Sequence, residues 1–210
     1  SAIREKWVAA WFHEFTNVSE ETKQISVRLY HLNPEGCLHV LRERFFAENE
    51  ADQFCRTLPV LTDCWNEALS IELVGWLKHE GIRPVTFRTA FEFLASQSSS
   101  HANSLAGYWL DQLQINPTSI SPALLDSICF CSLIFTGGTF FEQAFSLLGD
   151  AQNARRILCM GHSSFGIHGH GLSSKLNSLS TEQLGRFTVL MTKAFPELDD
   201  GDEAPADEIE

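Results

Sequence analysis

The sequence predicts an all-α protein, an irregular multi-helix domain built either as a helical bundle or as a short HEAT-like α-solenoid. Over most of the 210 residues, apolar side chains recur at the spacing that lines one face of a helix. Proline, serine, asparagine and glycine stand between these segments, where helices begin and end. Sharply repeated motifs of the tetratricopeptide or ankyrin kind are absent from the sequence, so both arrangements stay open.

Three amphipathic helices are expected in the first fifty residues. The first is indicated by apolar residues four positions apart, and the second begins near Ser19 and runs through Leu29. Asn33 and Pro34 are typical of the cap and first turn of a third helix. The apolar residues that define the first helix are Ile3, Trp7, Trp11 and Phe15.

The middle of the chain contains the strongest helical patterns. Residues 59–81 predict one long helix, which Gly81 is expected to end in a left-handed conformation. Pro84 begins the next helix, and a further apolar stripe covers 105–113. Ser121 caps the segment 122–135, which is apolar nearly all round, so we expect it at the centre of the fold.

Residues 128–145 have two interpretations. The Thr-Gly-Gly-Thr sequence from Thr136 to Thr139 breaks an apolar run, so the segment is either a helical hairpin or a small β-hairpin. Because the flanking segments are helical, we favour two helices.

The last part of the chain contains two helices and a tail. Asp150 caps a short helix through Leu158, and Ser180 with Gln183 is typical of a capping box. A stripe on the last helix faces inward, and Pro196 ends that helix. We therefore expect one helical domain over 1–196 and a disordered acidic tail over 197–210. The expected inward stripe consists of Leu184, Phe187, Met191 and Ala194.

Charge and cysteine content exclude some classes of protein. The net charge is −12, but the tail 197–210 contains eight acids and no base, which leaves −12 + 8 = −4 for 1–196. Without a basic cluster the chain is not expected to bind nucleic acid. The longest apolar run is too short to span a membrane. The six scattered cysteines indicate a reducing, cytoplasmic compartment, and the Ser-Ala start without Met suggests a fragment of a larger protein.

One stretch, 156–172, interrupts the helical pattern with glycine, histidine and serine. Its sequence from Gly161 to Phe165 resembles the G-x-S-x-G nucleophile elbow of α/β-hydrolases, although Phe165 stands in place of the second glycine. That resemblance implies a preceding strand at 157–160 and Ser163 as nucleophile, and His162 is a further candidate catalytic residue. Cys159 is a second candidate nucleophile because Arg155 and Arg156 precede it.

The same stretch contains candidate metal ligands. Cys159, His162, His168 and His170 supply the sulfur and nitrogen atoms that zinc prefers, but the paired cysteines of a usual structural zinc site are missing from the sequence. We therefore expect no cofactor, with zinc as the alternative.

A protein or peptide partner is the leading functional hypothesis. Trp7, Trp11 and Phe15 lie on the first helix, which has a neighbour on one side only, so their face is a candidate docking surface. The acidic chain suits a basic or amphipathic partner. The sequence therefore favours a non-enzymatic scaffold, adaptor or regulatory module, and a small hydrolase or metal-dependent enzyme using 159–171 is the alternative.

Overall fold

The computed structural model describes residues 20–116, 120–162, 176 and 178–196, with backbone only for 160–162. Every regular element in these ranges is a helix, so the all-α prediction is confirmed. In chain order they are α2 (Glu20–Leu32), α3 (Pro34–Glu50), the 3₁₀ helix η1 (Leu58–Cys64), α4 (Glu67–Leu77), α5 (Pro84–Gln97), α6 (Ser99–Ile115), α7 (Pro122–Phe135), α8 (Phe141–Leu148), α9 (Ala151–His162) and α11 (Thr181–Ala194).

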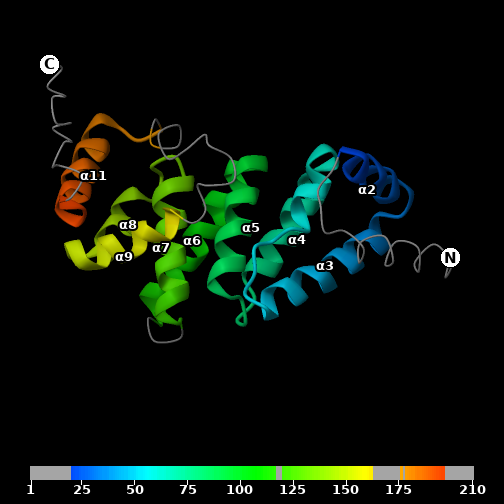
Figure 1. Ribbon diagram of the computed structural model, residues 1–210, viewed down its shortest axis with the longest axis horizontal. Coiled ribbons are helices and arrows are strands. Elements are labelled where there is room, and N and C mark those ends of the chain that lie inside the picture. The colour runs from blue at the N-terminus through cyan, green and yellow to red at the C-terminus, as the bar shows by residue number, and fades with distance from the viewer. Residues whose placement is uncertain (1–19, 117–119, 163–175, 177, 197–210) are drawn as a thin grey trace, which may run out of the picture.

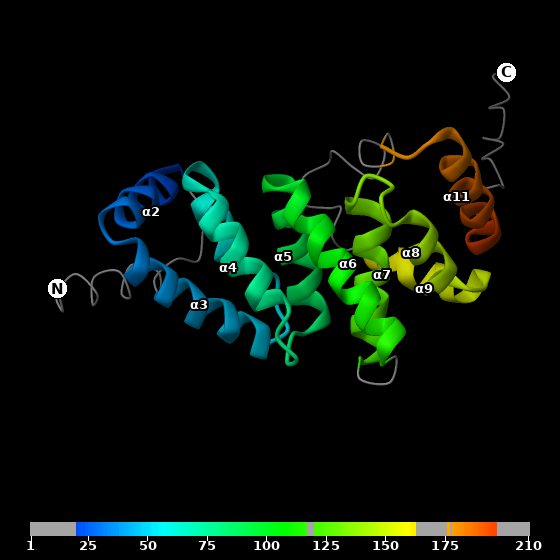
Figure 2. The ribbon, with the colours of Figure 1, turned by 180° about the vertical axis from the view of Figure 1, so that it is seen from behind.

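The helices form an elongated row, with α2 and α3 at one end and α11 at the other (Figures 1 and 2). Most helices pack against neighbours in the sequence: α4 on α5 and α6, α5 on α6 and α7, and α11 on α9. Helix α5 also contacts η1 and α3, so it joins the first part of the row to the rest. Among the helices of the described ranges, none is long and apolar enough to cross a bilayer.

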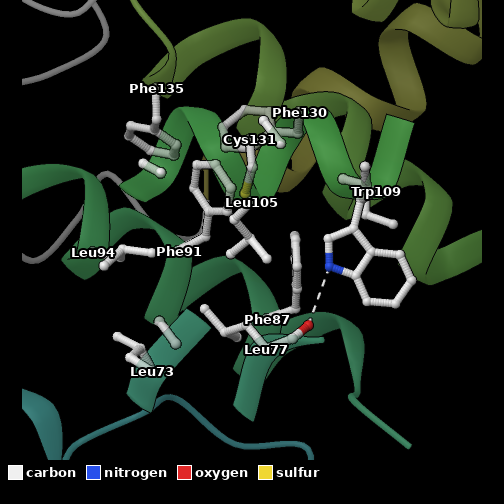
Figure 3. Packing of buried hydrophobic residues seen from close by; sticks show 14 of the residues in the cluster. Leu73, Leu77, Phe87, Phe91, Leu94, Leu105, Trp109, Phe130, Cys131 and Phe135 are labelled. Carbon is white, nitrogen blue, oxygen red and sulfur yellow. Dashed lines mark hydrogen bonds between the residues drawn. The ribbon is translucent and has the colours of Figure 1, made fainter. Parts of the chain in front are cut away.

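Helix α7 lies at the centre of the second part of the row, as the sequence predicts. It packs against α5, α6, α8 and α9, and residues 126–135 are buried without exception. Figure 3 shows Phe130, Cys131 and Phe135 from this helix above Phe87, Phe91 and Leu94 from α5. The indole N–H of Trp109 on α6 donates to the carbonyl of Leu77, the last residue of α4, over 3.1 Å. This bond satisfies a carbonyl that a helix end leaves without an intrahelical donor.

The predicted helix starts are confirmed by their hydrogen bonds. The Asn33 side chain accepts from the Gly36 amide at the start of α3, and Ser121 accepts from Leu124 at the start of α7. Asp150 accepts from the Asn153 amide over 2.8 Å at the start of α9, and Ser180 forms a complete capping box with Gln183. Each side chain satisfies amides that the first turn leaves without partners.

The long helix expected over 59–81 is wrong, because the segment is divided between η1 and α4. Asn66 separates them: its side-chain oxygen accepts from the Leu69 amide, and its amide group donates to the Tyr30 hydroxyl on α2. The expected left-handed Gly81 is also wrong, since it is not among the residues with positive φ. Helix α4 ends earlier, and the Gly81 amide donates to His79 Nδ1 over 3.0 Å.

The β-hairpin alternative for 128–145 is wrong, because α7 and α8 occupy this segment. The turn between them contains Gly137 and Gly138, whose φ values of +62° and +81° are in the left-handed region that favours glycine. The Gln183 side chain donates to the Gly138 carbonyl over 3.3 Å. The turn is thereby attached to the first turn of α11.

Candidate functional site

Most of the residues that the sequence suggests for chemistry or docking lie outside the described residues. This holds for Ser163, His168 and His170 in the glycine- and histidine-rich stretch. It also holds for the candidate docking residues Trp7, Trp11 and Phe15. Their suggested roles stay predictions. Cys159 and His162 are placed at the end of α9, with the His162 side chain not described.

Helix α9 continues through the start of the suspected catalytic stretch. The sequence predicts a helix to Leu158 and, from the hydrolase resemblance, a strand over 157–160, but α9 runs to His162. Ile157 and Leu158 are buried on this helix, whereas Cys159 is exposed. A nucleophile elbow needs a strand directly before its serine, so the strand that the resemblance implies is wrong.

The two arginines before Cys159 contact other helices. Arg156 forms a two-pronged ion pair with the buried carboxylate of Asp126 on α7, with nitrogen–oxygen distances of 2.7 and 2.8 Å. This hydrogen-bonded pair raises the pKa of Arg156. Arg155 donates to the Ala194 carbonyl over 3.3 Å and lies 5.3 Å from the ring centre of Phe195. Both arginines therefore attach α9 to neighbouring helices.

The other five cysteines are buried, and their thiols are poor nucleophiles. Burial raises the pKa of Cys37 and Cys64 to about 11 and that of Cys129 to about 12. Burial also raises the pKa of Cys55 and Cys131 well above the usual 9.0. Because the thiolate is the reactive form, these side chains are unsuited to nucleophilic catalysis near neutral pH.

This difference in burial predicts the reactivity of the thiols. In the folded protein at about pH 8, an aromatic disulfide reagent is expected to modify Cys159 rapidly and the five buried thiols only as the protein unfolds. The absorbance of the released thiolate measures both phases. In a Cys159→Ser variant the rapid phase should disappear, while urea should still expose the remaining five thiols. A rapid phase that persists in this variant would contradict the buried placement.

The described residues contain no cluster suited to a metal ion, and the pocket described below has an uncharged described lining. Within these ranges there is no cluster of three or more histidine, cysteine or acidic side chains that could hold a metal ion. A shallow pocket of about 370 Å³ lies where the α7–α8 turn faces the start of α6, and no ionisable side chain is in its described lining. The described part of the lining therefore offers no acid or base. Its lining is Ser99, Asn103, Ile134, Phe135, Thr136, Gly137 and Ser178.

Outward helix faces with exposed apolar side chains are the strongest candidate sites. On α4, Ile71 is 57 % exposed. On α11, Val189 is 56 % exposed. Leu184, which the sequence places on the inward stripe of α11, is 39 % exposed, so that placement is wrong, whereas Phe187 and Ala194 are buried as expected. Sequence reasoning missed a second stripe on each of these helices. Its residues recur every four positions on the side away from the core.

We define the α4 face as the outward side of α4 around Ile71. Exposed Glu67, Ala68 and Gly75 stand at helical spacing from Ile71, and exposed Glu72 directly follows it in the sequence. Glu67 Oε1 lies 3.2 Å from Nε2 of His101, which places the N-terminal end of this face beside α6. A Cβ added to Gly75 would meet no atom within 4 Å, so the surface is open at that point. The α4 face consists of Glu67, Ala68, Ile71, Glu72 and Gly75.

Comparisons with known proteins add no functional assignment: no family model matches the chain, and neither the curated proteins nor the solved structures provide a match.

Proposed function

We propose that this chain is a non-enzymatic interaction module, of the scaffold, adaptor or regulatory kind, that binds a basic amphipathic helix on the α4 face. The row of helices that pack on their sequence neighbours supports a short solenoid over a closed bundle, because a bundle would bring distant helices together around one axis. Solenoids use their extended helix surfaces for binding.

The exposed Ile71 carries this proposal. Ile71 is 57 % exposed and is not among the residues that pack against the core. It stands between two exposed carboxylates, Glu67 and Glu72, and two small residues, Ala68 and Gly75, leave room beside it. An apolar centre with a charged rim is the usual anatomy of a binding surface.

The charge distribution indicates a basic partner. From residue 57 to residue 77, the range that includes α4, the chain contains no Lys or Arg and three acids. A helix that laid apolar side chains on Ile71 and Ala68 could place Lys or Arg beside Glu67 and Glu72. Such complementary charges accelerate encounter and select against acidic partners.

The proposal also includes the cellular compartment of the protein. All six cysteines are free thiols, and five of them are buried in the apolar core. Unpaired cysteines used as small core residues are typical of proteins in a reducing environment. We therefore place the module in a reducing, intracellular compartment. Most residues of the hydrolase and zinc hypotheses lie outside the described ranges, so both stay alternatives to this proposal.

The test uses a fluorescent synthetic amphipathic helix of Leu and Lys, with a Leu and Glu helix as the acidic comparison. We expect the full chain to raise the fluorescence anisotropy of the Lys probe only, and Ile71→Glu to weaken binding about tenfold, because it removes the apolar centre of the face. Val189→Glu, an equally exposed position on another helix, is the matched control and should bind normally.

Two results would overturn the proposal. Equal binding of the Lys probe to the wild type and Ile71→Glu would show that the α4 face is not the site. If Ile71→Glu loses both binding and the far-UV circular dichroism signal, the variant has misfolded. The double variant Glu67→Lys/Glu72→Lys then tests the same face. It should exchange the preference from the Lys probe to the Glu probe, and failure to do so contradicts the charge argument.

A further inference from the structure

The outward side of α11 is partly apolar along its centre, with one acidic and one basic side chain on one flank. Phe187 and Ala194 are buried on the side of this helix that faces the rest of the protein, and α11 packs mainly on α9. At 100° per residue, Gly185 and Val189 lie on the opposite side. We define the α11 face by the residues on this side, all of them exposed: Thr181, Gly185, Thr188, Val189 and Thr192.

The threonine hydroxyls add little polarity to this face. The Thr188 hydroxyl donates to the Leu184 carbonyl over 2.9 Å, and the Thr192 hydroxyl donates to the Thr188 carbonyl over 3.2 Å. Both hydroxyls are thereby engaged with their own helix. A Cβ on Gly185 would meet no atom within 4 Å, so the surface is open beside the projecting Val189. The α11 face therefore has one protruding side chain, Val189, and one open position, at Gly185.

The α11 face also lies at the end of the row. Val189 is 56 % exposed near the middle of this face, and Gly185 one turn before it leaves an open position. Glu182 and Lys193 border the face on one flank. These features suit a second helix that places an apolar side chain beside Gly185 and charges along that flank.

The charges beside the face indicate what covers it. Glu182 and Lys193 are both exposed, and they lie about three turns apart on the same flank of α11. When two such helices pair antiparallel about a two-fold axis, equivalent flanks lie on the same side, and each Glu182 comes opposite the Lys193 of the other copy. The same pairing brings Val189 of one helix close to Gly185 of the other.

Arg186, the other cation of α11, does not disturb this pattern. Nη1 of Arg186 lies 2.7 and 2.8 Å from the two carboxylate oxygens of Glu142 on α8, and the guanidinium is 4.7 Å from the ring centre of Phe145. Arg186 is therefore held against its own chain, which leaves Glu182 and Lys193 to set the pairing.

The acidic C-terminal sequence favours the antiparallel orientation. Eight acids and no base follow directly after Pro196, shortly past the end of α11. In a parallel pair these two segments would begin side by side and repel each other. In an antiparallel pair they begin at opposite ends of the contact, and the repulsion between them is smaller.

We propose that the α11 face binds the α11 face of a second copy of this chain in an antiparallel, two-fold symmetric pair. A single pair of helices is a small interface, so we expect a weak dimer that exchanges with the monomer. The inference goes beyond the function proposed for the α4 face, and the two can fail separately because they use different helices.

The first test is sedimentation of the full chain over a range of concentrations. The wild type should shift from monomer to dimer, and Val189→Glu should weaken the dimer at least about tenfold, because it would bury a carboxylate without a partner. Ile71→Glu is the matched control, since it adds the same charge at an equally exposed apolar residue on α4. A wild type that stays monomeric up to millimolar concentration overturns the proposal, as does a dimer that Val189→Glu leaves unchanged.

The second test exchanges the charges. Glu182→Lys and Lys193→Glu each place like charges opposite one another twice in the symmetric pair, and each should weaken the dimer roughly tenfold. Mixing the two single variants should restore association as a heterodimer, because each contact then joins Lys to Glu. The double variant Glu182→Lys/Lys193→Glu should dimerise like the wild type. If the mixture stays monomeric while the wild type dimerises, the antiparallel register is wrong.

Discussion

Replacing Phe91 with alanine is expected to lower the free energy of unfolding by about 3–5 kcal/mol, because it leaves a cavity in a region that cannot close around it. The Phe91 ring is fully buried on α5, 5.7 Å from the Phe87 ring and 6.4 Å from the Phe135 ring, measured between centroids. These neighbours come from α5 and α7, the two helices that hold the row together (Figure 3). Urea unfolding followed by far-UV circular dichroism measures the change.

The matched control is Phe54→Ala. Phe54 is 37 % exposed, so losing its ring removes less apolar surface from the folded protein and leaves no closed cavity. We expect a change below about 1 kcal/mol for this variant. Equal destabilisation by the two substitutions would contradict the central position of Phe91.

Asn49→Ala is expected to cost about 2–4 kcal/mol, because it leaves two backbone groups without their partner. Asn49 is buried at the end of α3, where its side chain donates to the Gly81 carbonyl over 2.9 Å and accepts from the Arg83 amide over 2.8 Å. These bonds hold α3 to the segment that begins α5. The same unfolding measurement applies, and hydrogen exchange at the Arg83 amide should accelerate.

Two further variants test the reason for that cost. Glu50→Ala changes an exposed neighbour and should leave stability within about 0.5 kcal/mol of the wild type. Asn49→Asp keeps the acceptor for Arg83 but loses the donor for Gly81 and buries a carboxylate, so it should also destabilise. An Asn49→Asp variant as stable as the wild type would show that the bond to Gly81 contributes nothing.

Helix starts could be predicted from the sequence because their causes are local. Asn33, Ser121, Asp150 and Ser180 each accept from an amide three residues ahead, so the signal and the structure lie in the same few residues. The burial of 126–135 could also be predicted, since a helix that is apolar on all sides has no polar face to leave in contact with water.

The elements that sequence reasoning missed depend on distant partners. Asn66 divides the expected helix over 59–81 with the help of Tyr30 on α2, thirty-six residues away. The first turn of α5 has no side-chain cap from its own N-cap residue, and the Val85 amide donates instead to Asp52 over 3.0 Å. Periodicity contains no information about such partners.

The candidate surfaces were missed for a related reason. A single sequence shows the apolar stripe that faces the core. It does not show that Ile71 and Val189 face outward, because they differ from core residues only in that no other helix covers them. Leu184 is a further example. Its spacing from Phe187 suits the inward stripe, but its exposure shows that it lies at the edge of that stripe. The exposed fraction of each side chain, which requires the fold, separates these cases.

The burial of α7 has a consequence for the protein as it leaves the ribosome. The partners α5 and α6 are complete by residue 115, but the helix that covers them starts at Pro122 and ends at Phe135. While roughly the next thirty residues are still inside the exit tunnel, a length set by the rise of extended chain, Phe87, Phe91 and Leu105 have no cover from α7. During that interval the exposed apolar side chains favour aggregation of the nascent chain.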